Sequence, residues 1–289
     1  MNQSMCEGSL ESSRPVRRWP ARLDLVFRQG KARTVLERCR HEGPLRVQRL
    51  FYPDTLGTAH CYLLHPPGGV VLGDFLSIGV EHRSGRALLT TPSAGRFYTG
   101  GGFAETQQQR VELNVVSGTL EWLPQETILF SGAQAHLDTS IELAKGAKLA
   151  FWDVVVLGRP ACSDRFVEGF CRQRLRIRRE GRMLLQDQLR LEAGDRLCQS
   201  RQGLFGASTA GLAVFTETAS EALINDWLSC ENTAQHTGTF SLTQRGELLL
   251  ARYLGEDAQC CRAAFSRLWQ ALNSECYGHC PAEPRIWHT

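Results

Sequence analysis

The segment between His65 and Asp74 constrains the backbone more tightly than any other part of this 289-residue chain. Two consecutive prolines fix the torsion φ and remove two hydrogen-bond donors, and the two glycines after them adopt conformations that other residues avoid. Because the flanking sequence has short apolar runs typical of strands, this block predicts one sharp chain reversal. The residues of this motif are Pro66, Pro67, Gly68, Gly69, Gly73 and Asp74.

Short strand-like runs separated by Gly, Pro and Ser extend from Arg22 to about Leu191. Within them, a glycine turn between two apolar runs recurs at Gly85, Gly118 and Gly146, at spacings of 33 and 28 residues. Such self-similarity predicts stacked coils of strand, and the uneven period predicts a distorted, β-helix-like stack. Hairpins that recur in an ordinary β-sandwich would produce the same spacing.

Two helices are expected after the β body, which we place up to about residue 215. Ser220–Ser229 has a serine at the N-cap, and Asp257–Ser274 has apolar residues at helical spacing, with a glycine after its last turn. We expect the second helix to pack on the edge of the β body. The sequence therefore predicts a mostly β fold with a small C-terminal helical portion: a flexible N-terminal tail over 1–18 and a single domain over 19–289.

The composition excludes several classes of protein. The 33 basic and 30 acidic residues nearly balance, which argues against a nucleic-acid or membrane-surface protein defined by global charge. The longest apolar run, Leu149–Gly158, is too short to span a membrane and is broken by Asp153. The N-terminus has no apolar signal segment, and eleven cysteines lack regular spacing, so we expect reduced thiols in the cytoplasm.

Two groups of residues superficially match metal sites. His60 and His65 would point to opposite faces of a strand, and Cys61 would lie about 13 Å from His65, so ordinary packing is the favoured interpretation. The second group has an adjacent rather than a spaced cysteine pair, and a metal role is the minor interpretation there. This second group consists of Cys260, Cys261, Cys276, His279 and Cys280.

Arginines alternate with other residues between Arg172 and Arg179, which on a strand gives one basic face. This face could meet phosphate or an acidic protein surface, but solvation or pairing within the chain is the commoner outcome.

Three carboxylates stand out by their positions. Asp153 interrupts the most apolar segment, and a buried carboxylate needs a partner, a cation or a water-lined cavity. An ion pair with Arg159 or Arg96 is one possibility. Asp74 could cap the Pro-Pro-Gly-Gly turn, and Asp187 could be an ordinary exposed strand residue.

Further distinctive segments accompany the Pro-Pro-Gly-Gly motif: Thr91–Tyr98, Leu120–Glu126, Trp152–Asp153, Leu157–Pro160 and Pro284–Thr289. Taken together, these motifs resemble the UreD (also called UreH) family of urease accessory proteins. The resemblance runs from about Trp19 to the last residue, with two mild departures: Leu72 stands where a glycine is common, and Asp187 where a glutamate can occur.

The resemblance implies a non-catalytic scaffold that helps to deliver nickel to apo-urease, together with a UreF-type co-chaperone and a UreG-type GTPase. It implies no tightly bound cofactor, only transient nickel(II), and no nucleic-acid or membrane partner. A weak nickel path would use Asp74, Asp153 and Asp187, which match acidic family positions. Single carboxylates along a wet passage suit a conduit, because a tight site would trap the ion.

Two alternatives from other classes remain. A hydrolase could use paired carboxylates such as Glu121 and Glu126, which would have to converge in a deep pocket. A nucleic-acid binder could use the Arg172–Arg179 strand, with strongly salt-dependent affinity.

Overall fold

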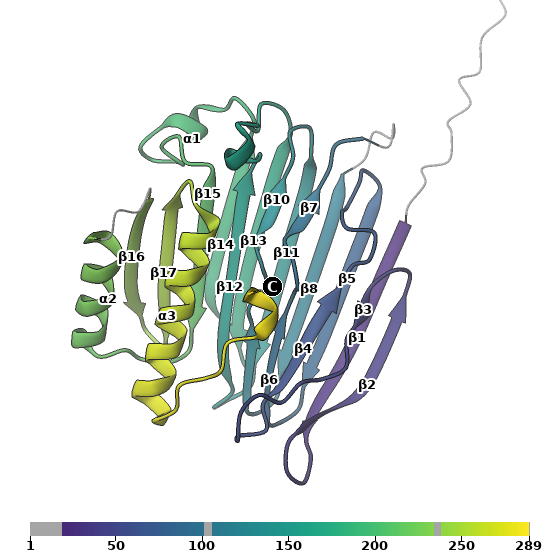
Figure 1. Ribbon diagram of the computed structural model, residues 1–289, viewed down its shortest axis with the longest axis vertical. Coiled ribbons are helices and arrows are strands. Elements are labelled where there is room, and N and C mark those ends of the chain that lie inside the picture. Colours follow the sequence, from purple (N-terminus) through teal and green to yellow (C-terminus); the bar gives the residue numbers. More distant parts are fainter. Residues whose placement is uncertain (1–18, 101–105, 234–237, 289) are drawn as a thin grey trace, which may run out of the picture.

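Two β-sheets face each other in the computed structural model, which describes residues 19–100, 106–233 and 238–288 (Figure 1). The predicted tail over 1–18 lies outside the described residues. The predicted mostly β class is confirmed.

The first sheet has seven strands. Its central strands are parallel, and an antiparallel strand is added at each edge. Their order is β14 (Arg182–Glu192), β13 (Phe170–Arg179), β11 (Gln134–Leu143), β8 (Gln107–Val115), β5 (Asp74–His82), β1 (Trp19–Gln29) and β2 (Thr34–Glu42).

The second sheet has ten strands, and its central strands β4, β6, β9 and β12 are parallel. The main order is β16 (Gly238–Arg245), β17 (Leu248–Gly255), β15 (Thr209–Phe215), β12 (Lys148–Leu157), β9 (Thr119–Trp122), β6 (Arg86–Thr90), β4 (Ala59–Leu64) and β3 (Arg46–Val47). Off this order, β10 (Thr127–Leu129) pairs with β12 and with β7 (Gly95–Phe97).

The glycines of the sequence repeat lie in stacked turns where the chain crosses between the sheets. All three have positive φ. The N–H of Thr119 donates to the carbonyl of Gly85 at 2.9 Å, and the N–H of Lys148 donates to the carbonyl of Gly118 at 2.8 Å. A Cβ on Gly118 would lie 2.1 Å from the Gly85 carbonyl oxygen, so only glycine permits this spacing.

Both predicted helices are present as α2 (Glu221–Thr233) and α3 (Ala258–Tyr277). The Ser220 hydroxyl accepts the Leu223 N–H, Asp257 caps α3, and Gly278 ends it in a left-handed conformation. The sequence did not predict the four-residue helix α1 (Arg196–Gln199). Two short 3-10 helices are η1 (Pro160–Cys162) and η2 (Arg285–His288).

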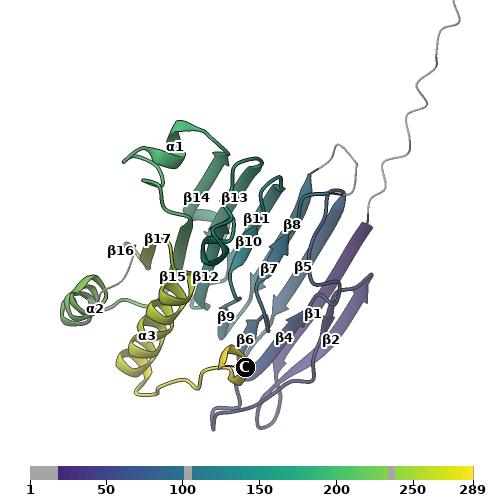
Figure 2. The same ribbon diagram turned by 45° about the horizontal axis from the view of Figure 1, so that its top comes forward.

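The expectation that the second helix packs on a sheet edge is wrong. Helix α3 lies across the outer face of the ten-stranded sheet, against β12, β15 and β17 (Figures 1 and 2). The reason is that β16 and β17, which follow residue 215, extend the sheet past the helix and form its edge themselves.

Strand alternation on β12 divides the interior into two cores. Leu149, Phe151 and Val155 face the other sheet, in what we call the inter-sheet core. Trp152 and Val154 face α3, in what we call the helix-side core. In the described part of the chain, no helix combines the length and apolar character needed to cross a membrane.

Candidate functional site

The Pro-Pro-Gly-Gly block forms the predicted reversal and leads from β4 in one sheet to β5 in the other. Gly68 has a φ of 77°, and its N–H donates to the His65 carbonyl at 2.9 Å. A Cβ on Gly69 would lie 2.1 Å from the Tyr98 ring, so this close approach also requires glycine. The Asp74 carboxylate accepts the Val71 N–H at 2.9 Å and thereby caps the turn.

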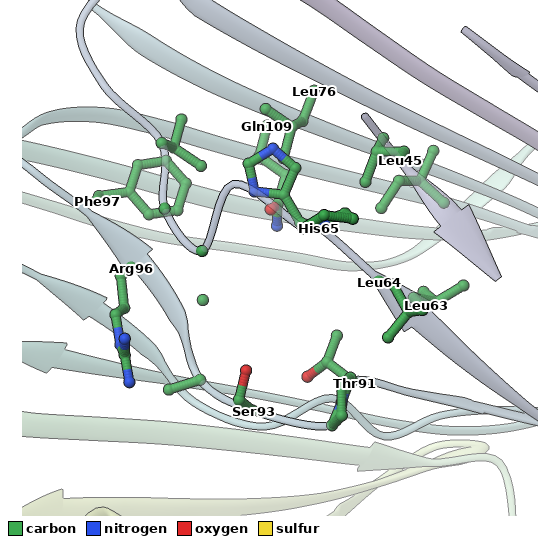
Figure 3. Close-up of a pocket in the computed structure, with 18 residues that line it drawn as sticks. Leu45, Leu63, Leu64, His65, Leu76, Thr91, Ser93, Arg96, Phe97 and Gln109 are labelled. Atoms are coloured by element: carbon green, nitrogen blue, oxygen red, sulfur yellow. The ribbon is translucent and has the colours of Figure 1, made fainter. Parts of the chain in front are cut away.

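A cavity of about 320 Å³ lies beside this turn, between the two sheets. Figure 3 shows it between the segment with Thr91 and Ser93 and the strands that carry Leu76 and Gln109. Its wall is largely apolar, so the Gln109 amide is one of the few polar groups on the side of the seven-stranded sheet.

A second amide on the same sheet, that of Gln173, also faces the inter-sheet core. Leu137 pairs with Gln109 on one side and with Gln173 on the other, so the three residues share one register row. The two glutamines are therefore two strand spacings, roughly 10 Å, apart. Gln173 lies on the same face of β13 as the buried Cys171 and Leu175, so its side chain faces the core.

Asp153 faces Gln173 from the opposite sheet. Burial raises the pKa of the Asp153 carboxyl to about 6, while hydrogen bonds from Gln173 and from the Val154 N–H limit the rise. Its side chain lies on the inter-sheet face of β12 yet retains intermediate exposure, unlike the fully buried residues beside it. Within the described residues, no cation forms an ion pair with it; Arg159, a partner considered from the sequence, instead binds Asp164 at 2.9 Å.

Asp187 lies at the edge of the inter-sheet space, on β14. Its carboxylate binds Arg252 of β17 at 2.5 Å, so this ion pair links the two sheets. Its partner Arg252 shares a register row with Asp153, because Leu212 pairs with Asp153 on one side and with Arg252 on the other. Asp153 and Arg252 are therefore two strand spacings, roughly 10 Å, apart across the sheet.

The three carboxylates predicted from the sequence do not meet in one site. Asp74 begins β5, which is three strand spacings, roughly 14 Å, from the strand that carries Gln173. Among the described residues, no group of three or more His, Cys, Asp or Glu side chains could hold a metal ion. The arrangement is a row of separated polar groups along the inter-sheet space.

The cysteine cluster considered from the sequence is divided by α3. Cys260 and Cys261 lie in its first turn and Cys276 near its end, about 22 Å apart at the helical rise. Cys261 is buried in the helix-side core, and the Cys276 thiol contacts the Thr218 carbonyl. In the other group, Cys61 lies in the inter-sheet core, whereas the adjacent His60 is buried on the opposite face of β4.

Both carboxylates of the hydrolase alternative and several arginines of the nucleic-acid alternative are paired within the chain. Glu121 binds Arg86 at 2.7 Å, and Glu126 binds Arg262 at 2.7 Å, so each carboxylate has its own arginine. On the basic strand β13, Arg172 and Arg174 both bind Asp138. Another of its arginines, Arg176, donates to Ser140.

Known proteins match this chain over nearly all of its described length. The sequence model of the family described as UreD urease accessory protein matches residues 20–288.

The chain belongs to the UreD family of urease accessory proteins.

A urease accessory protein UreD of Saccharophagus degradans is 43% identical over 282 residues, covering 95% of each chain. Another, of Nitrosococcus oceani, is 41% identical over 276 residues and covers 94% of this chain and 90% of the relative. A protein named urease accessory protein UreD 2, of Brucella anthropi, is 37% identical and covers 94% and 98%.

Sequence reasoning on this UreD-family chain missed three polar residues of the row: Gln109, Gln173 and Arg252. Glutamine on a strand is unremarkable in sequence. Only its position in the alternation of inward and outward side chains reveals that it points inward. Gln109 is in phase with Val111 and Leu113, and this phase was the available signal. The pairing of Arg252 depends on β17 joining the sheet, which no local pattern indicates.

Proposed function

We propose that this chain is a urease maturation scaffold that passes nickel(II) through its inter-sheet space to apo-urease. It would act in a complex with a UreF-type co-chaperone and a UreG-type GTPase. The family membership supports the role in urease maturation, and the polar row supports a route for the ion.

The observation that carries the proposal is the state of Asp153. A carboxylate in an inter-sheet core is unfavourable unless something compensates for its lost hydration. Here Asp153 has an amide partner and partial exposure, and among the described residues it has no ion-pair partner. An unneutralised carboxylate in a polar passage would attract a cation in transit.

The pKa of about 6 suits a transient contact. At neutral pH the carboxylate is mostly ionised and can bind Ni²⁺, for which carboxylate and water are acceptable ligands. A single carboxylate with an amide beside it supplies few ligands, so the ion would be held weakly and released. Gln109 and Gln173 offer amide oxygens on the way from the cavity, and Asp187 lies at the far edge.

The test is the nickel content of urease matured with variants of this chain. Asp153→Ala and Asp153→Asn should lower nickel per urease, while pull-down of urease and of both accessory partners stays at the wild-type level. Glu112→Gln is the matched control, because Glu112 is an exposed carboxylate on the outer face of the seven-stranded sheet. Normal nickel loading with intact complexes would remove Asp153 from the path.

A further inference from the structure

Two adjoining loops lie at one end of the sandwich. The first, residues 158–168, follows β12, and the second, residues 193–208, joins β14 to β15 and carries α1. Both line a pocket of about 300 Å³ with Phe166 on one side and Leu204 on the other, so they lie side by side. The loop with α1 extends beyond the strand ends in both views (Figures 1 and 2).

These loops expose large apolar side chains. Phe205 is 67% exposed and Val167 69% exposed, while Leu197 on α1 is 43% exposed. Scattered apolar residues on a surface are normal, but these three belong to two loops that share one pocket. We call these three exposed side chains, at one end of the sandwich, the end patch.

The backbone holds Phe205 in a conformation that an aromatic residue rarely adopts. Its φ is 50°, in the left-handed region, where a non-glycine residue costs about 1 kcal/mol or more. The preceding side chain, Leu204, is only 5% exposed and anchors the loop. Phe205 thus combines a strained backbone with an aromatic ring that is exposed to solvent.

The loop around Phe205 is tightly hydrogen-bonded. The N–H of Phe205 donates to Ser200, and that of Gly206 donates to Cys198 at 2.8 Å. A Cβ on Gly203 would lie 1.9 Å from the Leu197 carbonyl oxygen, so glycine permits a close backbone crossing. An aromatic side chain on so ordered a loop loses little conformational entropy on binding, which is the property of an interface anchor.

Unpaired basic groups surround the end patch. Arg165, Arg196 and Arg201 are exposed, and none of them forms an ion pair with another described residue. The Arg201 guanidinium lies 5.9 Å from the centroid of the Phe205 ring. Exposed carboxylates lie there too: Glu168, Asp195 at the N-cap of α1, and Glu256, which lines the same pocket. Among these groups, the Arg201 guanidinium beside the Phe205 ring is the one placed to meet a carboxylate on the rim of a partner's pocket.

We propose that the end patch docks apo-urease, with Phe205 inserted into an apolar pocket whose rim carries carboxylates. This inference rests on the proposed function, and urease is the macromolecule that the family's description names. Position supports it: the first loop starts at the end of β12, about 13 Å along the strand from Asp153. The second loop follows β14, in which Asp187 lies six residues, about 20 Å, before the loop begins. Urease bound there would lie closer along the strands to Asp153 than to Asp187, the last residue of the proposed nickel route.

The deciding variant is Phe205→Asn, assayed as the full chain co-expressed with its co-chaperone and GTPase and titrated against apo-urease. Asparagine tolerates positive φ, so the change removes the ring and relieves backbone strain together. We expect urease binding to weaken about 10- to 30-fold, as for loss of an interface anchor, with a melting temperature equal to or above that of the wild type. Arg201→Gln should weaken binding less, and more at low salt than at high salt.

Val116→Asn is the matched control, because Val116 is an exposed apolar residue at the opposite end of the sandwich and should leave binding unchanged. Unaltered urease affinity of Phe205→Asn overturns the docking proposal and leaves the scaffold role standing. Loss of the co-chaperone or GTPase instead of urease also overturns it, because the patch would then belong to a different partner. Failure of the wild-type complex to bind apo-urease would refute the proposed function itself.

Discussion

The helix-side core and the inter-sheet core each contain an acidic residue, but its partners differ between the two cores. In the helix-side core, Glu121 is 1% exposed and accepts hydrogen bonds from Arg86 and from the Trp269 indole N–H at 3.0 Å. In the inter-sheet core, Asp153 has an amide and a backbone N–H as its partners. A compensated charge serves stability, whereas an uncompensated one lowers stability and is retained where function needs it.

The two cores also differ in their other side chains. The helix-side core contains aromatic rings in contact: Trp152 lies 5.4 Å from Trp287 and 6.4 Å from Phe265 between centroids. The Trp287 N–H also donates to the Thr90 hydroxyl at 2.8 Å, so the C-terminal segment is attached to the sheet. The inter-sheet core is instead interrupted by a cavity and by inward-facing glutamines.

The largest expected effect is on Glu121. Glu121→Gln should destabilise the fold by about 3 kcal/mol, because it leaves Arg86, whose side chain is 15% exposed, without its counter-charge. Chemical denaturation at neutral pH measures this change. An unaltered unfolding midpoint would show that the contrast between the cores does not lie in charge compensation.

The same chemical change in the other core should have the opposite sign. The pKa of Asp153 is about 6 in the folded chain, above its ordinary value of 3.8, so the folded state binds the proton more tightly than the unfolded state. The associated stability is therefore full below about pH 4 and is lost as the pH rises to about 6. Asp153→Asn should stabilise the fold at pH 7.5 by about 2 kcal/mol, after allowance for partial exposure.

Melting temperatures of wild type and Asp153→Asn at pH 7.5 and pH 5 provide the measurement. The difference should be larger at pH 7.5 and shrink at pH 5, where the wild-type carboxyl is largely protonated. A destabilised Asp153→Asn at pH 7.5 would mean that the carboxylate is compensated after all.

The smallest expected effect is on the ion pair at the edge of the inter-sheet core. Arg252 is 47% exposed and Asp187 27% exposed at their side chains, and such pairs contribute less than about 1 kcal/mol. Asp187→Asn should lower the unfolding free energy by a few tenths of a kcal/mol in dilute buffer and by less in 1 M salt. A large, salt-independent loss would assign Asp187 to a structural role like that of Glu121.

Local signals in the sequence predicted much of this fold. The glycine spacing indicated the stacked turns, Ser220 and Asp257 marked the two helix starts, and Asp153 was conspicuous within an apolar strand. Each of these features depends on nearby residues alone. The family resemblance, now confirmed, came from unusual short motifs.

The features that sequence did not predict depend on long-range contacts. The place of α3 was mispredicted because β16 and β17 join the sheet from far along the chain. The partner of Asp187 was unknown for the same reason, since Arg252 is 65 residues away. The loop around Phe205 has neither helical nor strand periodicity, and its conformation comes from hydrogen bonds between its own backbone groups.

The stacked glycine turns also bear on the order in which the chain can fold. Each turn donates a backbone hydrogen bond to the one before it, and the separation along the chain is only about one coil. Such a stack can grow from its first coil as the chain leaves the ribosome, as in repeat proteins where each unit contacts its neighbours. The hydrogen bond between Trp287 and Thr90 spans 197 residues and can form only after Trp287 has been synthesised. Until then, Trp152 on the outer face of the ten-stranded sheet would lack its contact with the Trp287 ring.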